Sequence, residues 1–253
     1  NCNVNVCLAR LLNIPLVGCA SHRLNLAVKE FYVEYEELIE KLHKIMVKLR
    51  TPLEAAKLKR KTDLCAVLNQ ETRWWSTFAM IKRYIAIEPF IDTNSDVYDI
   101  LLNQVDKKQI DVLFEQLKVI ESVSKKLQEE KISMYEVRVL FDALIEQFPK
   151  MEQKLSKNSS IVKYPHFENA CVKIQKGVAL DNAEKRAVEE LTKKSHRSVT
   201  VSKPLSFAEA ALSKKKAQPQ YEYALCKSIP PTSNIAERLF SEAKSFYGLN
   251  RHR

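Results

Sequence analysis

The chain contains only three glycines among its 253 residues, Gly18, Gly177 and Gly248. Gly-rich phosphate loops and tight two-residue hairpins need glycine where φ is positive or where the backbone approaches a phosphate. Three isolated glycines cannot form such a loop, and doubly wound nucleotide-binding sheets need several. This scarcity predicts a mainly helical chain.

A long apolar seam predicts one helix from His22 to about Arg50. Apolar side chains recur along it in a 4-3-4-3 spacing, which keeps them on one helix face. The seam consists of Leu24, Val28, Phe31, Tyr35, Leu38, Leu42, Ile45 and Leu49. It fits either packing within the chain or a coiled coil, and we favour packing within the chain.

Turn and capping residues suggest where other elements begin and end. Thr51-Pro52-Leu53-Glu54 predicts a helix start, with Thr51 as the cap and Glu54 reaching back to the cap amide. The brief apolar run Ile14 to Ala20 predicts the one strand of the chain. A linker is expected near 195–205 from its Ser and Lys content. Further helices are predicted over 4–12, 73–90, 106–129, 135–155, 164–175, 182–194, 207–216 and 234–246.

The charge is uneven along the chain, which totals 41 Lys or Arg against 31 Asp or Glu. Residues 191–253 hold 12 Lys or Arg and 4 acidic residues, which leaves 29 against 27 in residues 1–190. A basic segment on a near-neutral body favours a polyanionic partner, most often nucleic acid. A solvated Lys-rich surface is the alternative.

The spacing of the cysteines and the lengths of the apolar runs limit the classes of protein to which the chain can belong. The six cysteines have no repeating spacing in a chain of this length, which indicates reduced thiols in an intracellular protein. No run approaches the ~18 apolar residues of a membrane span, so no membrane partner is expected.

The nearest approach to a metal pattern is Cys19-Ala20-Ser21-His22. Structural zinc sites need four ligands, usually as two close pairs, and the chain has no second such pair. We therefore favour Cys19 as a buried small side chain that closes the strand and His22 as the start of the long helix.

Arg73-Trp74-Trp75-Ser76 contains both tryptophans of the chain. Adjacent residues on a helix point about 100° apart, so one indole is expected in the core and the other at a boundary or exposed. Core packing is the simpler interpretation. The functional one is a flat ring beside a guanidinium, suited to stacking on an unpaired base.

The stretch from Pro230 to Phe240 allows two roles for Glu237. The prolines end any preceding helix, and Asn234 with Glu237 fits the spacing of a cap residue and its carboxylate partner. The alternative is a metal-binding carboxylate on the first turn of a helix. Spacing alone does not separate the two roles.

Three blocks in these regions resemble the hAT superfamily of DNA transposases, and they occur in the family's order. The first, from Cys19 to Val28, includes His22 and Asn25. The second is Thr72 to Thr77, with Arg73 and Trp74. The third is Ile229 to Ser241, which includes Pro231, Ser233, Glu237 and Arg238.

The resemblance implies a ribonuclease H-like catalytic domain interrupted by a large helical insertion. Residues 1–21 would be the end of the ribonuclease H-like part, with its last strand near 14–20. Residues 22–215 would be the insertion, and 216–253 would carry the third catalytic carboxylate and the dimerisation region. In such transposases three carboxylates hold two divalent metals, Mg or Mn, for DNA cleavage.

Site roles follow from the same resemblance. Glu237 would be the third metal carboxylate, and Arg73 and Trp74 would bind DNA, with Trp74 stacking on a flipped or hairpin base. The implied partners are transposon-end DNA and further copies of the chain, and the implied location is the nucleus.

The chain also departs from the family pattern. Both aspartates of the family's carboxylate triad, the upstream strands and a BED-type zinc finger are missing from it. We therefore expect a fragment that binds no metal and is catalytically inactive as given. A domesticated nuclear protein that dimerises without catalysis is the alternative.

Overall fold

In the computed structural model the chain is mainly α-helical, as the glycine scarcity predicts. The structure describes residues 3–70, 74–92, 95–191, 193–194 and 221–249. The described elements are α1 (Asn3–Leu11), α2 (Ala20–Tyr32), η1 (Val33–Tyr35), α3 (Glu36–Lys48), α4 (Pro52–Lys59), α5 (Trp74–Ile87), η2 (Glu88–Phe90), η3 (Tyr98–Ile100), α6 (Gln104–Lys126), α7 (Met134–Gln147), η4 (Pro149–Met151), α8 (Glu152–Leu155), α9 (Pro165–Lys176), α10 (Asn182–Ala187), η5 (Glu189–Leu191), β1 (Lys193–Lys194), β2 (Tyr221–Glu222), α12 (Ala224–Lys227) and α13 (Asn234–Leu249). Within these ranges, no helix combines the length and the apolar character that crossing a bilayer requires.

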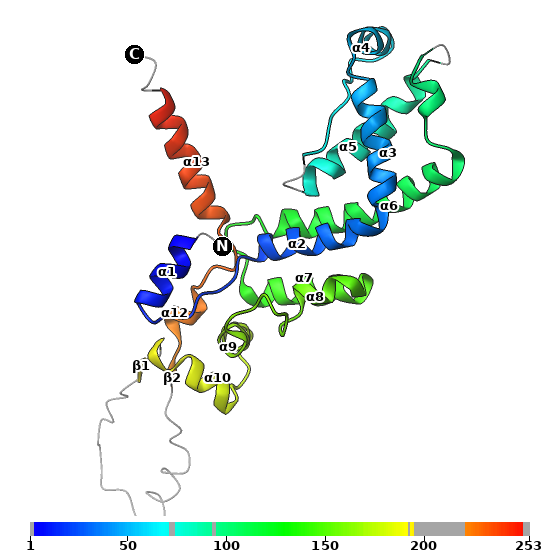
Figure 1. The fold of residues 1–253 in the computed structure, drawn as a ribbon. Coiled ribbons are helices and arrows are strands. Elements are labelled where there is room, and N and C mark those ends of the chain that lie inside the picture. Colours follow the sequence, from blue (N-terminus) through cyan, green and yellow to red (C-terminus); the bar gives the residue numbers. More distant parts are fainter. Residues whose placement is uncertain (1–2, 71–73, 93–94, 192, 195–220, 250–253) are drawn as a thin grey trace, which may run out of the picture.

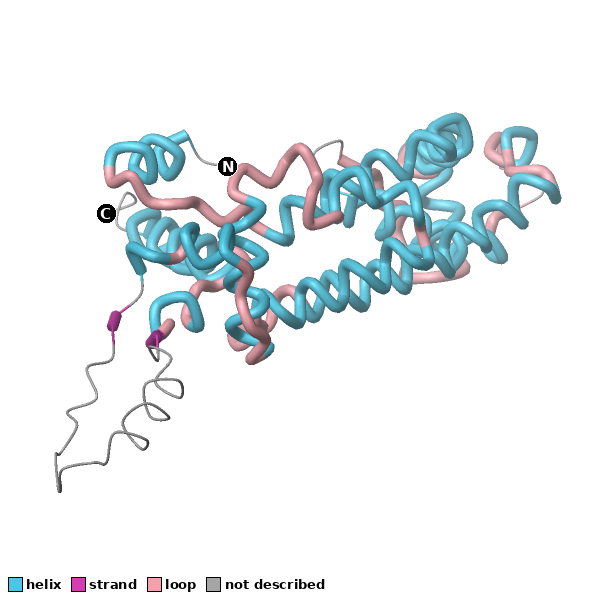
Figure 2. Tube along the Cα trace, turned by 90° about the horizontal axis from the view of Figure 1, so that it is seen from below, coloured by secondary structure: helices cyan, strands magenta, loops and turns pink. Residues whose placement is uncertain are grey.

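The larger hydrophobic core, here called the body core, draws its side chains from α2 through α8. In Figure 1, α2 and α6 extend along the molecule beside α7 and α8, while α3, α4 and α5 gather at one end. The largest side chains that are fully buried there include Tyr84, Phe141, Leu42 and Leu113. Figure 2 shows how far helix dominates the described chain.

The predicted apolar seam packs within the chain. Seven of its eight positions are buried, and the eighth, Tyr35, packs partly buried against the body core. The helix itself is not continuous, because α2 passes into the 3₁₀ turn η1 before α3 begins at Glu36. This turn lets the two halves of the seam bury their apolar faces against different helices: α2 packs on α8 and η4, and α3 packs on α5.

A second, smaller core lies at the other end, where α9 packs against α7, α10 and α12. Its buried side chains include Phe167, Ala170, Cys171 and Cys226. The two short strands β1 and β2 lie beside it and pair antiparallel, with Lys193 opposite Glu222 and Lys194 opposite Tyr221.

Several helix ends have local causes in the sequence. At the start of α7, Ser133 and Glu136 form a complete capping box. At the end of α9, Gly177 adopts a positive φ of 78° as the C-cap. Asn13, with φ of 50°, turns the chain after α1, a conformation that asparagine tolerates better than most residues.

The predicted capping box at α4 is wrong. Pro52 does begin the helix, but the Thr51 hydroxyl donates to the carbonyl O of Lys48 at 2.8 Å instead of capping. Glu54 does not reach back to the cap. Its carboxylate is buried (2% exposed), accepts from Lys57 Nζ at 2.8 Å and contacts the hydroxyl of Ser95, which gives it stronger partners than an amide at the helix start.

The predicted strand over residues 14–20 is also wrong. Residues 14–19 have no regular secondary structure, and Ala20 already belongs to α2. Cys19 has the extended backbone of an N-cap residue, with φ −65° and ψ 119°. An apolar extended segment becomes a strand only where a neighbouring strand can pair with it, and no described strand lies beside this one.

The C-terminal helix α13 projects away from the rest of the molecule (Figure 1). It begins at Asn234, as the sequence predicts, and continues to Leu249. The expected linker at 195–205 and the expected helix at 207–216 lie outside the described residues.

Candidate functional site

The N-terminal end of α2 joins the first and third sequence blocks. Ala20 N donates to the carbonyl O of Pro231 at 2.9 Å. Ser233 N donates to Cys19 Sγ at 3.4 Å, and Ser233 Oγ lies 3.2 Å from the same sulfur. Two stretches 214 positions apart in sequence therefore meet through main-chain and side-chain bonds.

The first turn of α13 is fixed to the ends of α2 and α6. Asn234 Nδ2 donates to Ser21 Oγ at 3.2 Å and to the carbonyl O of Leu127 at 2.9 Å. One turn later, Arg238 Nη2 donates to the carbonyl O of Gln128 at 2.9 Å. The junction therefore includes the end of α6, to which the sequence analysis gives no role.

Glu237 lies beside this junction with its side chain exposed. Its Oε1 accepts a hydrogen bond from Ser233 Oγ at 2.9 Å. The expected cap pair of Asn234 and Glu237 does not form, because the amide of Asn234 is directed to α2 and α6 instead. The carboxylate thus stays at the surface, held by one serine.

The donor set around Glu237 does not fit a divalent metal. Metal sites for Mg or Mn gather several oxygen ligands, and a two-metal site needs several carboxylates. Across the part of the chain that the structure describes, no three His, Cys, Asp or Glu side chains come together in a way that could hold an ion. We therefore derive no chemical step through a metal.

The second block meets α2 further along the helix, at Asn25 and Tyr32. Asn25 Oδ1 accepts from Trp74 N at 3.4 Å, and Tyr32 Oη donates to the carbonyl O of Trp74 at 3.2 Å. Asn25 therefore helps to position the start of α5. Arg73, which the sequence pairs with Trp74, lies outside the described residues.

The two indoles divide as the helix geometry predicts. Trp74 is only 6% exposed and packs toward Phe78, while Trp75 is 44% exposed. The two rings meet edge to face, with centroids 5.6 Å apart and planes at 82°. Trp75 therefore presents the accessible ring, and the stacking role that the resemblance gives to Trp74 stays a prediction.

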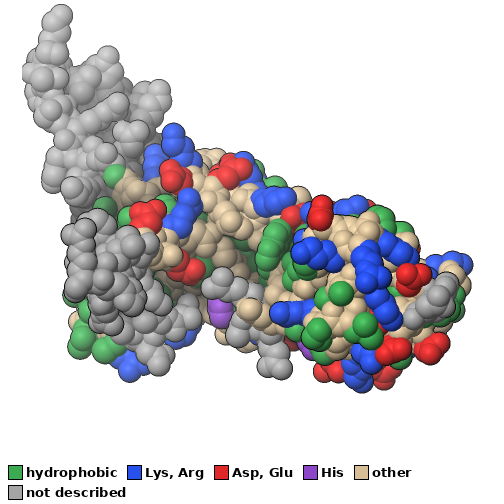
Figure 3. Space-filling view, turned by 90° about the horizontal axis from the view of Figure 1, so that it is seen from above, with side chains coloured by type: hydrophobic (Ala, Val, Ile, Leu, Met, Phe, Trp, Pro, Cys, Tyr) green, Lys and Arg blue, Asp and Glu red, His purple; other side chains and the backbone are tan. Residues whose placement is uncertain are grey.

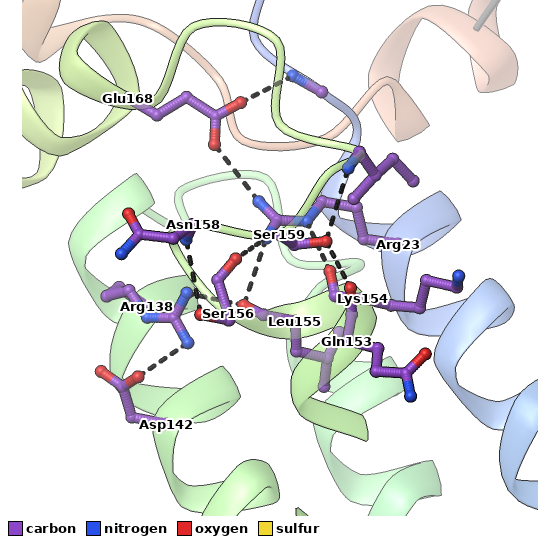
Figure 4. Close-up of polar contacts among 12 residues, drawn as sticks. Arg23, Arg138, Asp142, Gln153, Lys154, Leu155, Ser156, Asn158, Ser159 and Glu168 are labelled. Carbon is purple, nitrogen blue, oxygen red and sulfur yellow. Dashed lines mark hydrogen bonds and ion pairs between the residues drawn. The ribbon is translucent and has the colours of Figure 1, made fainter. Parts of the chain in front are cut away.

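Arg23 lies on the side of α2 that faces α8 and α9 (Figure 4). It is only 6% exposed, although it carries a charge. Its guanidinium donates to the carbonyls of Lys154 (3.2 Å), Leu155 (3.1 Å) and Ser156 (2.9 Å) and to Glu168 Oε2 (3.2 Å). A buried cation is stable only with such a full set of acceptors, so Arg23 ties α2 to α8 and α9.

Glu168 completes this network. Its Oε1 accepts from Gly18 N at 3.2 Å, which connects α9 to the segment before α2. Burial raises the pKa of the Glu168 carboxyl, and the Arg23 guanidinium and the Gly18 amide offset part of that effect. Nearby, Arg138 Nη1 donates to the carbonyl O of Leu155 at 2.7 Å and Nη2 pairs with Asp142.

Sequence reasoning missed Arg23 and Glu168, and it gave Asn234 a capping role in place of its contacts with α2 and α6. Arg23 lies one turn from both Ala20 and Ala27 on the apolar face of α2, and a charge on an apolar face is a detectable sign of a buried ion pair. Nothing local in the sequence identifies Glu168 as its partner. His22, in contrast, is exposed and joins none of these contacts, although it belongs to the first block.

The surface charges of the body agree with the nearly equal numbers of basic and acidic residues in residues 1–190. On the face shown in Figure 3, Lys and Arg side chains lie among Asp and Glu, without one large area of a single sign. Several cations of the described body are paired, as in Lys61 with Asp92 at 3.0 Å. The body therefore offers no concentrated basic surface on this face.

No protein-family model, curated protein or solved structure matches the chain. The functional conclusion must therefore come from the residues and from the contacts they make.

Proposed function

We propose that this chain is part of a hAT-type DNA transposase and contributes DNA binding and self-association. The observation that supports the proposal is the meeting of all three sequence blocks on α2. The first block supplies Cys19 and Asn25, which contact Ser233 of the third block and Trp74 of the second. The second and third blocks therefore both contact the helix that carries the first.

The finer fold assignment belongs to the same proposal. Residues 22–215 would be the helical insertion of a ribonuclease H-like domain, and α13 would carry the third carboxylate, Glu237. The exposed apolar side chains of α13, Leu239 and Phe240 among them, support a role against a further layer of protein. Nuclear location follows if the partner is DNA.

Catalysis is not part of what we propose for these 253 residues. The third block supplies one carboxylate, and two-metal DNA cleavage requires more ligands than one. Incubation of the purified chain with a terminal-repeat duplex and Mg or Mn is expected to leave the DNA intact. Metal-dependent cleavage would contradict this.

DNA binding is tested with the purified chain and labelled DNA at several salt concentrations. Phosphate contacts release counterions, so the association constant is expected to fall steeply and log-linearly as salt rises. A binding constant that does not change with salt, or no binding at low salt, would overturn the proposal.

The two tryptophans make that test residue-specific. Trp75→Ala removes the exposed ring and is expected to weaken binding to hairpin or unpaired ends more than to plain duplex, because stacking contributes about 1–3 kcal/mol per base. Tyr164→Ala is the matched control, an exposed aromatic residue just before α9. Equal losses on both DNAs would leave stacking without support.

Trp74→Ala separates a stacking role from a packing role. Its ring is buried, so this substitution should lower the thermal stability of the protein, with a loss of about 3–5 kcal/mol. A selective loss of hairpin binding without a loss of stability would instead assign the stacking role to Trp74.

A second candidate function is a dimerising interaction protein that does not bind DNA. The observation that favours it is the exposed apolar surface on α13, where Ile235, Leu239 and Phe240 are 44%, 61% and 76% exposed. Sedimentation separates the candidates. A stable dimer without DNA affinity at moderate salt supports the second, and a monomer excludes it.

A further inference from the structure

A cavity of about 430 Å³, its opening to solvent included, lies between α2, α7 and α9. Its cationic side chains are those of Arg23, Arg138 and Lys157. Among the described residues that line it, Glu168 alone is acidic, and both of its oxygens are already engaged, one by Gly18 N and the other by Arg23 Nη1. The charges of Arg138 and Lys157 therefore have no counterion among the described residues of the cavity wall.

Arg138 is less well satisfied than Arg23, although the two guanidinia are neighbours. Both donate to the carbonyl O of Leu155, Arg23 at 3.1 Å and Arg138 at 2.7 Å (Figure 4). Nε and Nη2 of Arg138 are screened from solvent and have no hydrogen-bond partner among the described residues. Nη2 lies 2.7 Å from Asp142 Oδ1 as an ion pair outside hydrogen-bond geometry, and the Asp142 side chain is 67% exposed. Such buried donors call for a further acceptor, either a water or an ion.

The two guanidinia also repel each other. Arg23 Cζ lies 5.5 Å and Arg138 Cζ 5.8 Å from the centroid of the Phe141 ring, so both charges gather around one side chain. Burial lowers the pKa of Arg23, the Glu168 carboxylate raises it, and the nearby Arg138 lowers it again. Repulsion between like charges is stronger where burial lowers the effective dielectric, and a bound anion offsets it. The cavity therefore favours a negatively charged ligand.

We propose that this cavity binds a phosphate-type dianion. Arg138 turns from Asp142 to the dianion, because the exposed Asp142 carboxylate is also solvated by water and holds the guanidinium weakly. Lys157, which is exposed at the edge of the cavity, and Asn169 on α9 supply further donors. Two cations without a counterion match the charge of a dianion, and a planar guanidinium matches the oxygens of phosphate. This inference does not depend on the proposed function, since it rests on the cavity and its charges.

Equilibrium dialysis of the full chain against labelled inorganic phosphate tests the proposal, with the ionic strength held constant by chloride. We expect one phosphate to be retained per chain. If the cavity takes up only water, no phosphate is retained above the chloride background, and the proposal is wrong. Retention of several equivalent phosphates per chain would show general attraction to surface cations and would also overturn it.

Two substitutions in the cavity wall locate the bound phosphate. Arg138→Gln removes a charged donor and should weaken binding by about tenfold or more. Lys157→Gln should weaken it by up to about fivefold, because the charge that it removes is exposed. Lys163→Gln is the matched control, since Lys163 is exposed on the same loop between α8 and α9 but does not line the cavity. Lys157→Gln decides the question even if Arg138→Gln folds poorly, and equal binding by Lys157→Gln and Lys163→Gln overturns the proposal.

Asp142→Asn tests the exchange of partners at Arg138. This substitution removes the carboxylate that competes with phosphate for the guanidinium, so phosphate binding should tighten by up to about fivefold. A role of Arg138 in holding the fold alone predicts no such gain. Unchanged or weaker binding in this variant would contradict the exchange.

Two single-stranded oligonucleotides that differ only in a 5′ phosphate identify the source of the bound group. Competition with inorganic phosphate by the phosphorylated strand alone assigns the cavity to a DNA end. If neither strand competes, the cavity takes free phosphate or a small phosphorylated compound. Equal competition by both strands would indicate contact with the DNA backbone at the surface and would count against the cavity.

Discussion

The body and the C-terminal helix α13 have similar amphipathic patterns but opposite surroundings. On α3, Leu42 is fully buried, whereas Leu239 on α13 is 61% exposed and Phe240 is 76% exposed. The body helices pack against several neighbours, while the described contacts of α13 are concentrated in its first turns, at Asn234 and Arg238. Apolar spacing therefore specifies that a helix forms but not whether a partner covers it.

The comparison also separates two ways of holding a helix. Arg23 inside the body satisfies a buried charge with a full set of acceptors. At α13, hydrogen bonds at a partly exposed junction hold the helix in place, for example the bond from Asn234 to Ser21. Loss of the buried bonds of Arg23 would leave charged groups without partners and strongly lower the free energy of unfolding, whereas the bonds of Asn234 compete with hydrogen bonds to water.

The largest expected effect is that of Arg23→Met. It leaves Glu168 buried without its cation and removes the donors to three carbonyls, so the free energy of unfolding should fall by about 3–5 kcal/mol. Denaturant unfolding measures the loss. Lys44→Met removes the exposed pair with Glu40 and should change stability by less than about 1 kcal/mol. Similar losses in the two variants would contradict the role of Arg23.

A matched pair of leucines tests the comparison directly. Leu42→Ala opens a cavity in the body core and should cost about 2–5 kcal/mol. Leu239→Ala removes an exposed side chain and should change stability by no more than about 0.5 kcal/mol in dilute monomer. If the second variant loses as much as the first, α13 is covered in solution, and the loss should then depend on protein concentration.

Two serines at helix starts form a third pair. Ser133→Ala removes one half of the capping box of α7 and should cost about 0.5–2 kcal/mol. Ser233→Ala removes the hydroxyl contacts with the exposed Glu237 and with Cys19 Sγ, and it should cost less because this junction is partly exposed. Thermal unfolding ranks the two, and the reverse order would show that the α13 junction is the stronger of the two helix starts.

The carboxylate of Glu136 provides an independent check of the capping box at the start of α7. Hydrogen bonds from Ser133 hold the pKa of Glu136 below its usual value. The backbone N–H of residue 133 is the larger cause and is kept in Ser133→Ala, so this variant should raise the pKa of Glu136 only part of the way to its usual value, which an NMR titration can follow. An unchanged Glu136 titration would mean that the Ser133 hydroxyl does not contact this carboxylate in solution.

The smallest effect concerns pH and Glu168. Burial raises the pKa of Glu168 in the folded state, so between its usual and its raised pKa the folded chain binds more protons than the unfolded one. The contribution of this group to the free energy of unfolding therefore decreases as pH rises through that window. Glu168→Gln cannot ionise at this position and should give a flatter dependence of the free energy of unfolding on pH, which denaturant unfolding at several pH values measures.

Local signals predict the helices well and their interruptions poorly. The seam from Leu24 to Leu49 and the start of α13 at Asn234 follow from apolar periodicity and from the prolines before the helix. The 3₁₀ turn at Val33 does not follow from them, because it reflects packing on α8 at one end and on α5 at the other. The same limit explains the error at Ile14 to Ala20, where an apolar run of strand character lies without a pairing strand.

Site residues could be predicted where the signal lies within one block, but not where it depends on contacts between blocks. Cys19, Asn25 and Ser233 are named from sequence, and the structure places Cys19 and Ser233 at the N-terminal end of α2 and Asn25 near the middle of the same helix. The partners Glu168 and Leu127 are distant in sequence and carry no distinctive local pattern. Which of Trp74 and Trp75 is exposed depends on the direction of the core, and helix geometry alone predicts only that the two differ.

The bond between Cys19 and Ser233 also has a consequence for the order of folding. Its partners are separated by 214 positions, so the chain must close a very long loop before the contact stabilises anything. The body core needs no residue beyond Leu155, and it can therefore form during synthesis before α13 has left the ribosome. We expect α13 to dock last, on a body that is already folded.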